Sequence, residues 1–118
     1  MKFLFIDDDE NFLEHVKSVA GSFHLDFDTA STLTEGRMMM DSTPYDHVFI
    51  DVFMKDGNGV DFAYENNYYP GELHIMTGDF NKDGCADKFN GRAMSLSLVS
   101  KEVFTNFLHS LSSYASKR

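Results

Sequence analysis

The sequence predicts a single α/β domain: a three-layer, doubly wound five-stranded parallel sheet in the strand order 2-1-3-4-5. Two observations predict it. Short apolar runs alternate five times with segments whose apolar residues recur at helical spacing. This alternation is typical of parallel strands joined by right-handed crossovers. The short runs are also continuously apolar, as expected of strands that helices cover on both faces.

The first two strand–helix units are defined by capping and breaking residues. Asp8 or Asp9 is a suitable N-cap for the first helix, and Gly21 is suited to end it. The second helix is expected to end before Pro44. The predicted elements are, in order, a strand over residues 2–6, a helix over 9–21, a strand over 24–28 and a helix over 32–41.

The boundaries of the remaining three strand–helix units are less clear from the sequence. A third buried strand runs straight into Asp51, and the loop KDGNG follows it. No clear helical pattern fills the fourth unit, whereas Ser100 is suited to cap a final helix with one apolar face. The predicted elements are a strand over residues 47–51, a helix over 60–65, strands over 73–76 and 94–99, and a helix from residue 100 onward.

The composition excludes several classes of function. The 118 residues include 19 acidic and 10 basic side chains, a formal net charge of −9, which disfavours nucleic acid or an anionic membrane as the main partner. A lone cysteine, Cys85, cannot form an internal disulfide. No apolar run approaches the roughly 20 residues of a membrane span, and Asp7 interrupts any signal-peptide core. We therefore expect a cytoplasmic, single domain over residues 1–118.

Carboxylates gather where the predicted strands end. Asp7 and Asp8 follow the first strand, Asp51 ends the third, and Thr77 ends the fourth. The carboxyl ends of parallel strands meet at one edge of the sheet, where ligands bind. Close carboxylates raise one another's pKa values unless a cation lies between them, and Mg²⁺ prefers such oxygen ligands. The sequence therefore predicts a magnesium site at this edge.

Three stretches together resemble a known family. FLFIDDDENFLEHV, HVFIDVFMKDGNGVDF and LHIMTG resemble the receiver domain of two-component response regulators, in matching order across essentially the whole chain. The resemblance implies a flavodoxin-like fold. It also implies that Asp7, Asp8 and Asp51 bind Mg²⁺, that Asp51 is the phosphoacceptor and that Thr77 contacts the phosphoryl group. Lys55 stands where the family usually has proline.

The resemblance further implies a role in phosphorelay signal transduction. A stand-alone receiver accepts its phosphoryl group from a sensor histidine kinase or a phosphotransfer protein and signals to a downstream protein target. No output domain is expected within residues 1–118. Such a domain is not an enzyme in the ordinary sense, since its chemistry is limited to self-phosphorylation and autodephosphorylation.

The segment before the last helix departs from the family pattern. Aligning SLVSKEVF with the usual Lys-Pro-Phe run puts Ser97 at the lysine position that contacts the phosphoryl group, and Met94 at the aromatic switch position. Serine supplies no cation, which leaves Lys55, Lys82 and Lys101 as candidates to replace it. The alternative is a degenerate pseudo-receiver that acts as a phosphorylation-independent interaction module.

A second departure is DFNKDGCADKFN, residues 79–90. It matches much of a calcium-binding loop, with Asp79, Asn81, Asp83 and Asp87 as side-chain ligands, although Asn90 replaces the bidentate glutamate. The alternative is a polar turn that leads into a short fourth helix.

Metal binding by histidine and phosphate-ester hydrolysis are two other chemistries to which the sequence can be compared. The histidines show no metal-ligand spacing, so we expect them to be structural. The run Asp7–Asp9 also satisfies the Asp-x-Asp motif of phosphohydrolases that resemble haloacid dehalogenases, but the chain is short for that fold. Asp51→Asn abolishes phosphoryl labelling in a receiver, whereas Asp7→Asn removes the nucleophile of a phosphohydrolase.

Overall fold

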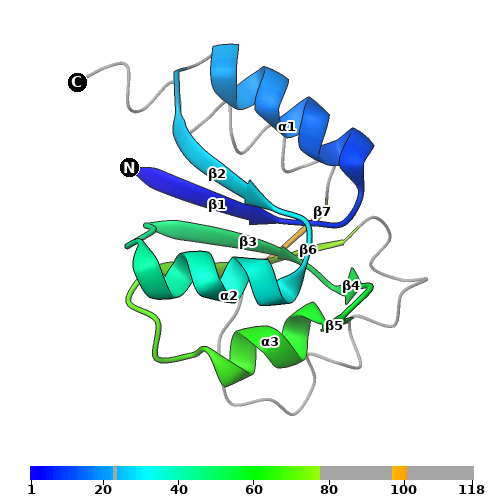
Figure 1. Ribbon diagram of the computed structural model, residues 1–118, viewed down its shortest axis with the longest axis vertical. Helices are drawn as coiled ribbons and strands as arrows, with labels where there is room; N and C mark the ends of the chain where they lie inside the picture. The colour runs from blue at the N-terminus through cyan, green and yellow to red at the C-terminus, as the bar shows by residue number, and fades with distance from the viewer. Residues whose placement is uncertain (23, 78–96, 101–118) are drawn as a thin grey trace.

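The computed structural model describes residues 1–22, 24–77 and 97–100 of the chain. Within these residues, one parallel sheet holds five strands in the order β2-β1-β3-β6-β7 (Figure 1). This is the predicted order 2-1-3-4-5, so the expected fold class is confirmed. The strands are β1 (Lys2–Ile6), β2 (Asp26–Ala30), β3 (His47–Asp51), β6 (Glu72–Thr77) and β7 (Ser97–Ser100).

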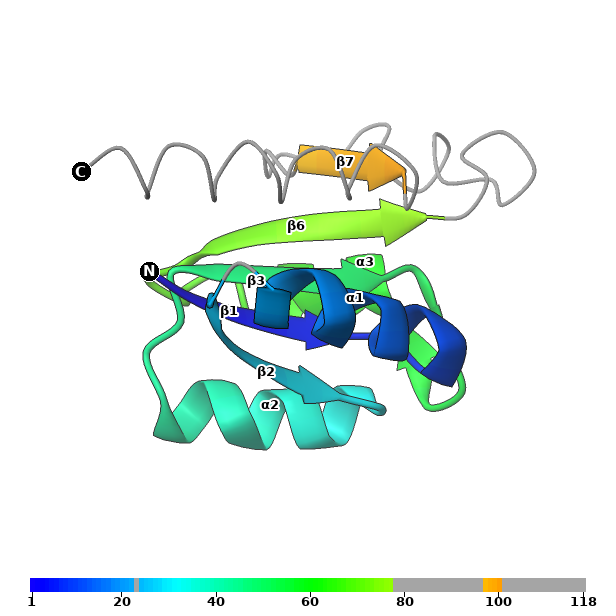
Figure 2. The ribbon, with the colours of Figure 1, turned by 90° about the horizontal axis from the view of Figure 1, so that it is seen from above.

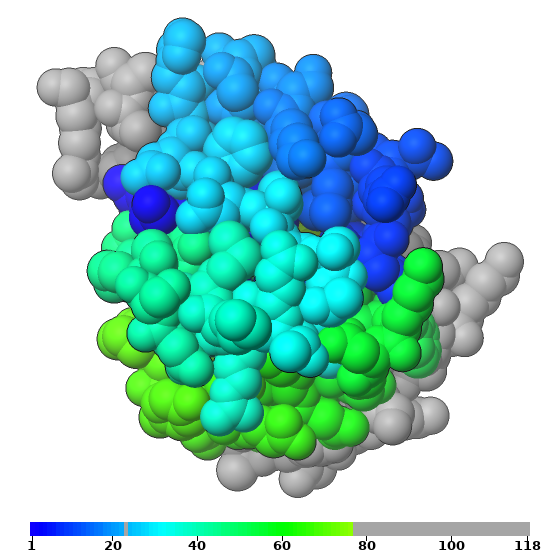
Figure 3. Space-filling model, viewed as in Figure 1, coloured from blue at the N-terminus to red at the C-terminus, as the bar shows by residue number. Residues whose placement is uncertain are grey.

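Helices lie on both faces of the sheet. Figures 1 and 2 show α1 (Glu10–Ser22) on one side and both α2 (Leu33–Ser42) and α3 (Gly59–Glu65) on the other. The space-filling view of Figure 3 shows the cyan side chains of α2 next to the green side chains of α3. The helices of the described residues therefore provide the two outer layers that the sequence predicts.

The sheet divides the core into a smaller part rich in phenylalanine and a larger, mostly aliphatic part. Successive strand residues point to opposite faces, so one strand serves both parts. Burial of each such side chain stabilises the fold by about 1.5–3 kcal/mol. The α1 side contains Phe3, Phe5, Leu13, Val16, Phe49 and Met76, and the α2–α3 side includes Leu4, Ile6, Val48, Ile50, Val60 and Ile75.

The second strand begins two residues later than expected. The prediction placed it over residues 24–28, whereas β2 spans Asp26–Ala30. His24 has a φ of 56° and its backbone N–H bonds to the carbonyl of Gly21 at 3.1 Å. Leu25 likewise donates to Ala20 at 3.0 Å. These bonds close the end of α1, so His24 and Leu25 belong to the turn and cannot enter the sheet.

The loop after β3 contains more order than the sequence suggested. A short antiparallel hairpin pairs β4 (Phe53–Met54) with β5 (Gly57–Asn58). Asn58 then caps α3 by accepting bonds from Val60 N at 2.8 Å and Asp61 N at 3.2 Å. A Cβ on Gly59 would collide with the carbonyl oxygen of Asp51, so only glycine lets this loop pass so close to the end of β3.

Several expectations fall outside the described residues. These are the fourth helix, the calcium loop with Asp79, Asn81, Asp83 and Asp87, and the helix after Ser100. In the part of the chain that the structure describes, no helix has the length and apolar character needed to cross a bilayer.

Candidate functional site

An acidic cluster lies at the carboxyl edge of the sheet. Asp7 directly follows β1 and Asp51 ends β3, and these two strands are paired neighbours. Carboxylate oxygens of Asp7, Asp8 and Asp51 all lie within 4.8 Å of one another. Asp7 is fully buried and Asp51 is 9% exposed. The convergence expected from the strand ends is therefore present in the structure.

Backbone hydrogen bonds hold the cluster in place. The amide of Asp7 donates to the carbonyl of Ala30 at 3.0 Å, which extends the β1–β2 pairing by one residue. One carboxylate oxygen of Asp7 accepts the amide of Asp9 at 2.9 Å, and one of Asp8 accepts the amide of Lys55 at 3.0 Å. The carboxylates of Asp7 and Asp8 are thus each oriented by a backbone amide of a nearby segment.

Asp9 has a structural role. Its carboxylate accepts the amide of Phe12 at 3.2 Å, and its carbonyl accepts the amide of Leu13 at 3.0 Å, so it is the N-cap of α1. The sequence predicted either Asp8 or Asp9 as the N-cap of this helix. Because Asp9 takes it, helix capping accounts for one acid of the run and leaves Asp7 and Asp8 for the cluster.

Asp56 has a role that sequence reasoning missed. Its carboxylate accepts the amides of Leu33 at 3.0 Å and Thr34 at 3.1 Å, and also the Thr34 hydroxyl. These bonds, that of Leu33 above all, hold the pKa of the Asp56 carboxyl below its ordinary value. The loop after β3 is thereby fixed to the first turn of α2. No local pattern reveals this contact, since 22 or more positions separate the partners.

The two residues expected to contact a phosphoryl group, Thr77 and Ser97, lie at different positions along their strands. Thr77 ends β6 one residue past Met76, which pairs with Asp51, so Thr77 lies at the edge of the acidic cluster. Ser97 does not. It begins β7 opposite His74, and Ser100 is the residue opposite Thr77. Ser97 therefore lies three residues before the position opposite Thr77, and its role as a phosphoryl contact stays a prediction.

The donor set suits Mg²⁺. The cluster offers only carboxylate oxygens, which are the hard ligands this ion prefers, and it draws them from two strand ends. The fit rests on the chemistry and convergence of these three side chains. Asp7, Asp8 and Asp51 are the residues that would hold the ion.

Comparison with solved structures identifies the fold. A two-component response regulator from Clostridium difficile superimposes with a TM-score of 0.78 at 19% identity, over 100% of this chain and 97% of that one. A CheY-like receiver domain from Methanospirillum hungatei JF-1 gives 0.70 at 14% identity, over 98% and 96%. The chain has the fold of a response-regulator receiver domain. A receiver-fold response regulator from Thermotoga maritima, solved in complex with Mg²⁺-BeF, gives 0.65 at 20% identity, over 84% of both chains.

The likeness is confined to structure. No protein-family model matches the sequence, and no curated protein matches it. The receiver fold nevertheless places the carboxyl ends of β1, β3 and β6 at one edge, where Asp7, Asp51 and Thr77 are found.

A second group of polar side chains lies at the other end of the sheet. His47, Glu72 and His74 come together there, although the sequence pattern predicts only structural roles for the histidines. Burial, and to a smaller extent the nearby His47, lower the pKa of His74 to about 4 against the opposing effect of Glu72. The signal for this group was the Glu-x-His spacing on one strand, combined with a histidine at the start of its partner.

Proposed function

We propose that this chain is a phosphorelay receiver that accepts a phosphoryl group on Asp51. The observation that carries the proposal is the convergence of Asp7, Asp8 and Asp51 within 4.8 Å at the carboxyl edge of a receiver fold. Helix capping accounts for Asp9 but for none of these three. Buried carboxylates in such proximity need a counter-charge, and a divalent ion with a phosphoryl group supplies chemistry that uses all of them.

The chemistry is a single group transfer. A carboxylate oxygen of Asp51 attacks phosphorus, the bond from phosphorus to the donor breaks, and the donor leaves with that bonding pair. The product is an acyl phosphate on Asp51. Asp7, Asp8 and Asp51 would hold Mg²⁺, which when bound would supply positive charge to offset that on the transferred oxygens. We assign to Thr77, which ends the strand next to that of Asp51, the donation of a hydroxyl hydrogen bond to one of those oxygens.

The proposal implies two protein partners. The donor is a sensor histidine kinase or a phosphotransfer protein, and a downstream protein target reads the phosphorylated state. The Thermotoga maritima neighbour, solved with Mg²⁺-BeF, supports Mg²⁺ as the ion for this fold. A receiver acts by changing partner affinity, so no turnover of an external substrate is expected.

The test is incubation of the chain with Mg²⁺ and acetyl phosphate, read by intact mass. We expect one added phosphoryl group on the unmodified chain and none on Asp51→Asn. Asp9→Asn is the matched control, because Asp9 caps α1 and should leave labelling intact.

Each alternative has its own outcome. Labelling that survives Asp51→Asn but not Asp7→Asn would favour the phosphohydrolase chemistry. No labelling of any folded chain, with Mg²⁺ binding confirmed by titration, would favour a phosphorylation-independent interaction module.

A further inference from the structure

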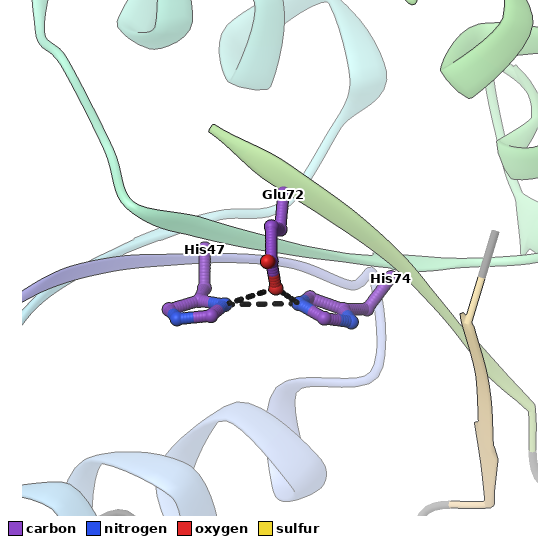
Figure 4. Close-up of side chains that lie close together, drawn as sticks. All are labelled: His47, Glu72 and His74. Carbon is purple, nitrogen blue, oxygen red and sulfur yellow. Dashed lines mark hydrogen bonds and ion pairs between the residues drawn. The ribbon is translucent and has the colours of Figure 1, made fainter. Parts of the chain in front are cut away.

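The amino-terminal edge of the sheet gathers three potential metal ligands. His47 begins β3 and Glu72 begins β6, and the parallel register pairs them directly. His74 lies two residues after Glu72, so both side chains leave the same face of β6. Figure 4 shows the two imidazole rings with nitrogens directed at each other and the Glu72 carboxylate between them.

The three donor atoms form a compact triangle. His47 Nδ1 lies 3.0 Å from His74 Nε2, and Glu72 Oε2 lies 3.5 Å from the first and 3.7 Å from the second. The point in their plane equally distant from all three lies about 2.0 Å from each, and Zn²⁺ binds His nitrogen at about 2.0–2.1 Å and carboxylate oxygen at about 2.0–2.2 Å. The triangle therefore has the size of one face of a zinc coordination sphere.

Hydrogen bonding explains only one side of the triangle. A proton shared between His47 and His74 accounts for their 3.0 Å separation. The Glu72 oxygen is too distant from either nitrogen for a good hydrogen bond. A common ligand between the atoms accounts for all three distances.

We propose that His47, Glu72 and His74 bind a divalent transition-metal ion, with Zn²⁺ the best fit. Two imidazoles and one carboxylate are a known ligand set for Zn²⁺ with a further position open to water. Imidazole nitrogen favours Zn²⁺, Cu²⁺ or Ni²⁺ over Mg²⁺, which separates this site chemically from the acidic cluster.

The histidines are held before any ion arrives. The His47 ring stacks on Phe3 at 5.5 Å between centroids, and the His74 ring stacks on Phe49 at 4.6 Å. Their side chains are only 13% and 10% exposed, whereas that of Glu72 is 72% exposed. The two nitrogen ligands are therefore rigid, and the carboxylate can close on an ion that enters from solvent.

Access exists on the surface beside the site. A hollow of about 360 Å³ lies at this edge, and its lining includes Tyr45, His47 and Glu72. The backbone of Glu72 is fixed there by a 2.9 Å bond to the carbonyl of Asp46. An ion can thus reach His47 and Glu72 without opening the sheet.

The direct test is imidazole ¹⁵N NMR on the metal-free full chain during a Zn²⁺ titration. We expect the ligating nitrogens to be His47 Nδ1 and His74 Nε2, with one ion bound per chain. Glu72→Gln should lower Zn²⁺ affinity by at least about tenfold, since even outer-shell partners of metal ligands contribute about 10–100-fold. Its exposed side chain makes loss of folding improbable on physical grounds.

Matched variants locate the ion. His15→Gln removes an exposed histidine of α1 and Glu65→Gln an exposed glutamate of α3, and both should bind Zn²⁺ as the unmodified chain does. Asp51→Asn should also retain the imidazole shifts, because the acidic cluster lies at the opposite edge. The proposal is wrong if Glu72→Gln and His47→Gln bind Zn²⁺ normally, if His15 and His24 shift as much as His47 and His74, or if only Asp51→Asn abolishes binding.

Discussion

The backbone amide of Lys55 donates a hydrogen bond to Asp8 Oδ2 at 3.0 Å, which ties the loop after β3 to the acidic pair after β1. The contact uses the peptide group of Lys55, so it does not depend on the charge of the Lys55 side chain. A proline at this position would fix φ and remove the donor.

The first prediction tests this bond. Lys55→Pro should lower the free energy of unfolding by about 0.5–1.5 kcal/mol relative to Lys55→Ala, which loses the same side chain but keeps the amide. Urea denaturation of both variants at the same pH measures the difference. Equal stabilities would mean that the amide–carboxylate bond contributes nothing in solution.

The second prediction concerns acid stability. The lowered pKa of Asp56 means that its carboxylate stabilises the fold above its ordinary pKa of 3.8, and that this contribution is lost as pH falls through the lower folded-state value. Asp56→Asn should therefore flatten the decline of stability below pH 3.8. It should also cost about 1 kcal/mol at neutral pH, because the amides of Leu33 and Thr34 lose a charged acceptor. Thermal unfolding at a series of pH values measures both effects.

Asp41→Asn is the control for that series. Asp41 is an exposed acid of the same helix, and removing its charge should leave the acid-dependent decline unchanged. If both variants flatten the decline equally, the net charge of the protein and not the hydrogen bonds to Asp56 is responsible.

The third prediction uses two glycines with opposite surroundings. Gly59→Ala should destabilise the fold by about 1–3 kcal/mol, because its Cβ meets the Asp51 carbonyl. Gly21→Ala, with no atom within 4 Å of the added Cβ, should stabilise α1 by up to about 1 kcal/mol. Chemical denaturation gives both values. A stabilising Gly59→Ala would show that the loop can move away from β3.

The fourth prediction follows from the register of β7. Ser100 lies opposite Thr77, so Ser100→Lys brings a cation to the edge that holds the acidic cluster, whereas Ser97→Lys does not. We expect Ser100→Lys to enlarge the amide shifts caused by Mg²⁺ with beryllofluoride, since charge-assisted bonds are about twice as strong as neutral ones. Ser97→Lys should leave them near those of the unmodified chain.

A further variant identifies the cation of the unmodified chain. Lys101 follows Ser100 directly in the sequence, so Lys101→Ala should reduce the same shifts more than Lys82→Ala does. Larger shifts in Ser97→Lys than in Ser100→Lys would contradict the observed register as the basis of the effect.

Local sequence patterns were enough to predict those strands that are continuous apolar runs. The apolar runs determine β1 and β3, and the aspartates that end them reach one edge because parallel strands share a direction. The start of β2 was missed because His24 adopts a positive φ, which no apolar pattern encodes. His47 and His74 were missed as a pair because only the β3–β6 register brings together residues 27 positions apart.

Both candidate sites take one residue from β3, so each site can serve as the internal reference for the other in a metal titration. Asp51 is four residues beyond His47 on β3, about 13 Å along an extended strand. In a single sample, Mg²⁺ added first should shift the NMR signals at the Asp51 end of β3. An ion that prefers nitrogen ligands, added second, should shift those at the His47 end. A change at one site on binding at the other would then measure how strongly a structural change propagates along four peptide units of a hydrogen-bonded strand.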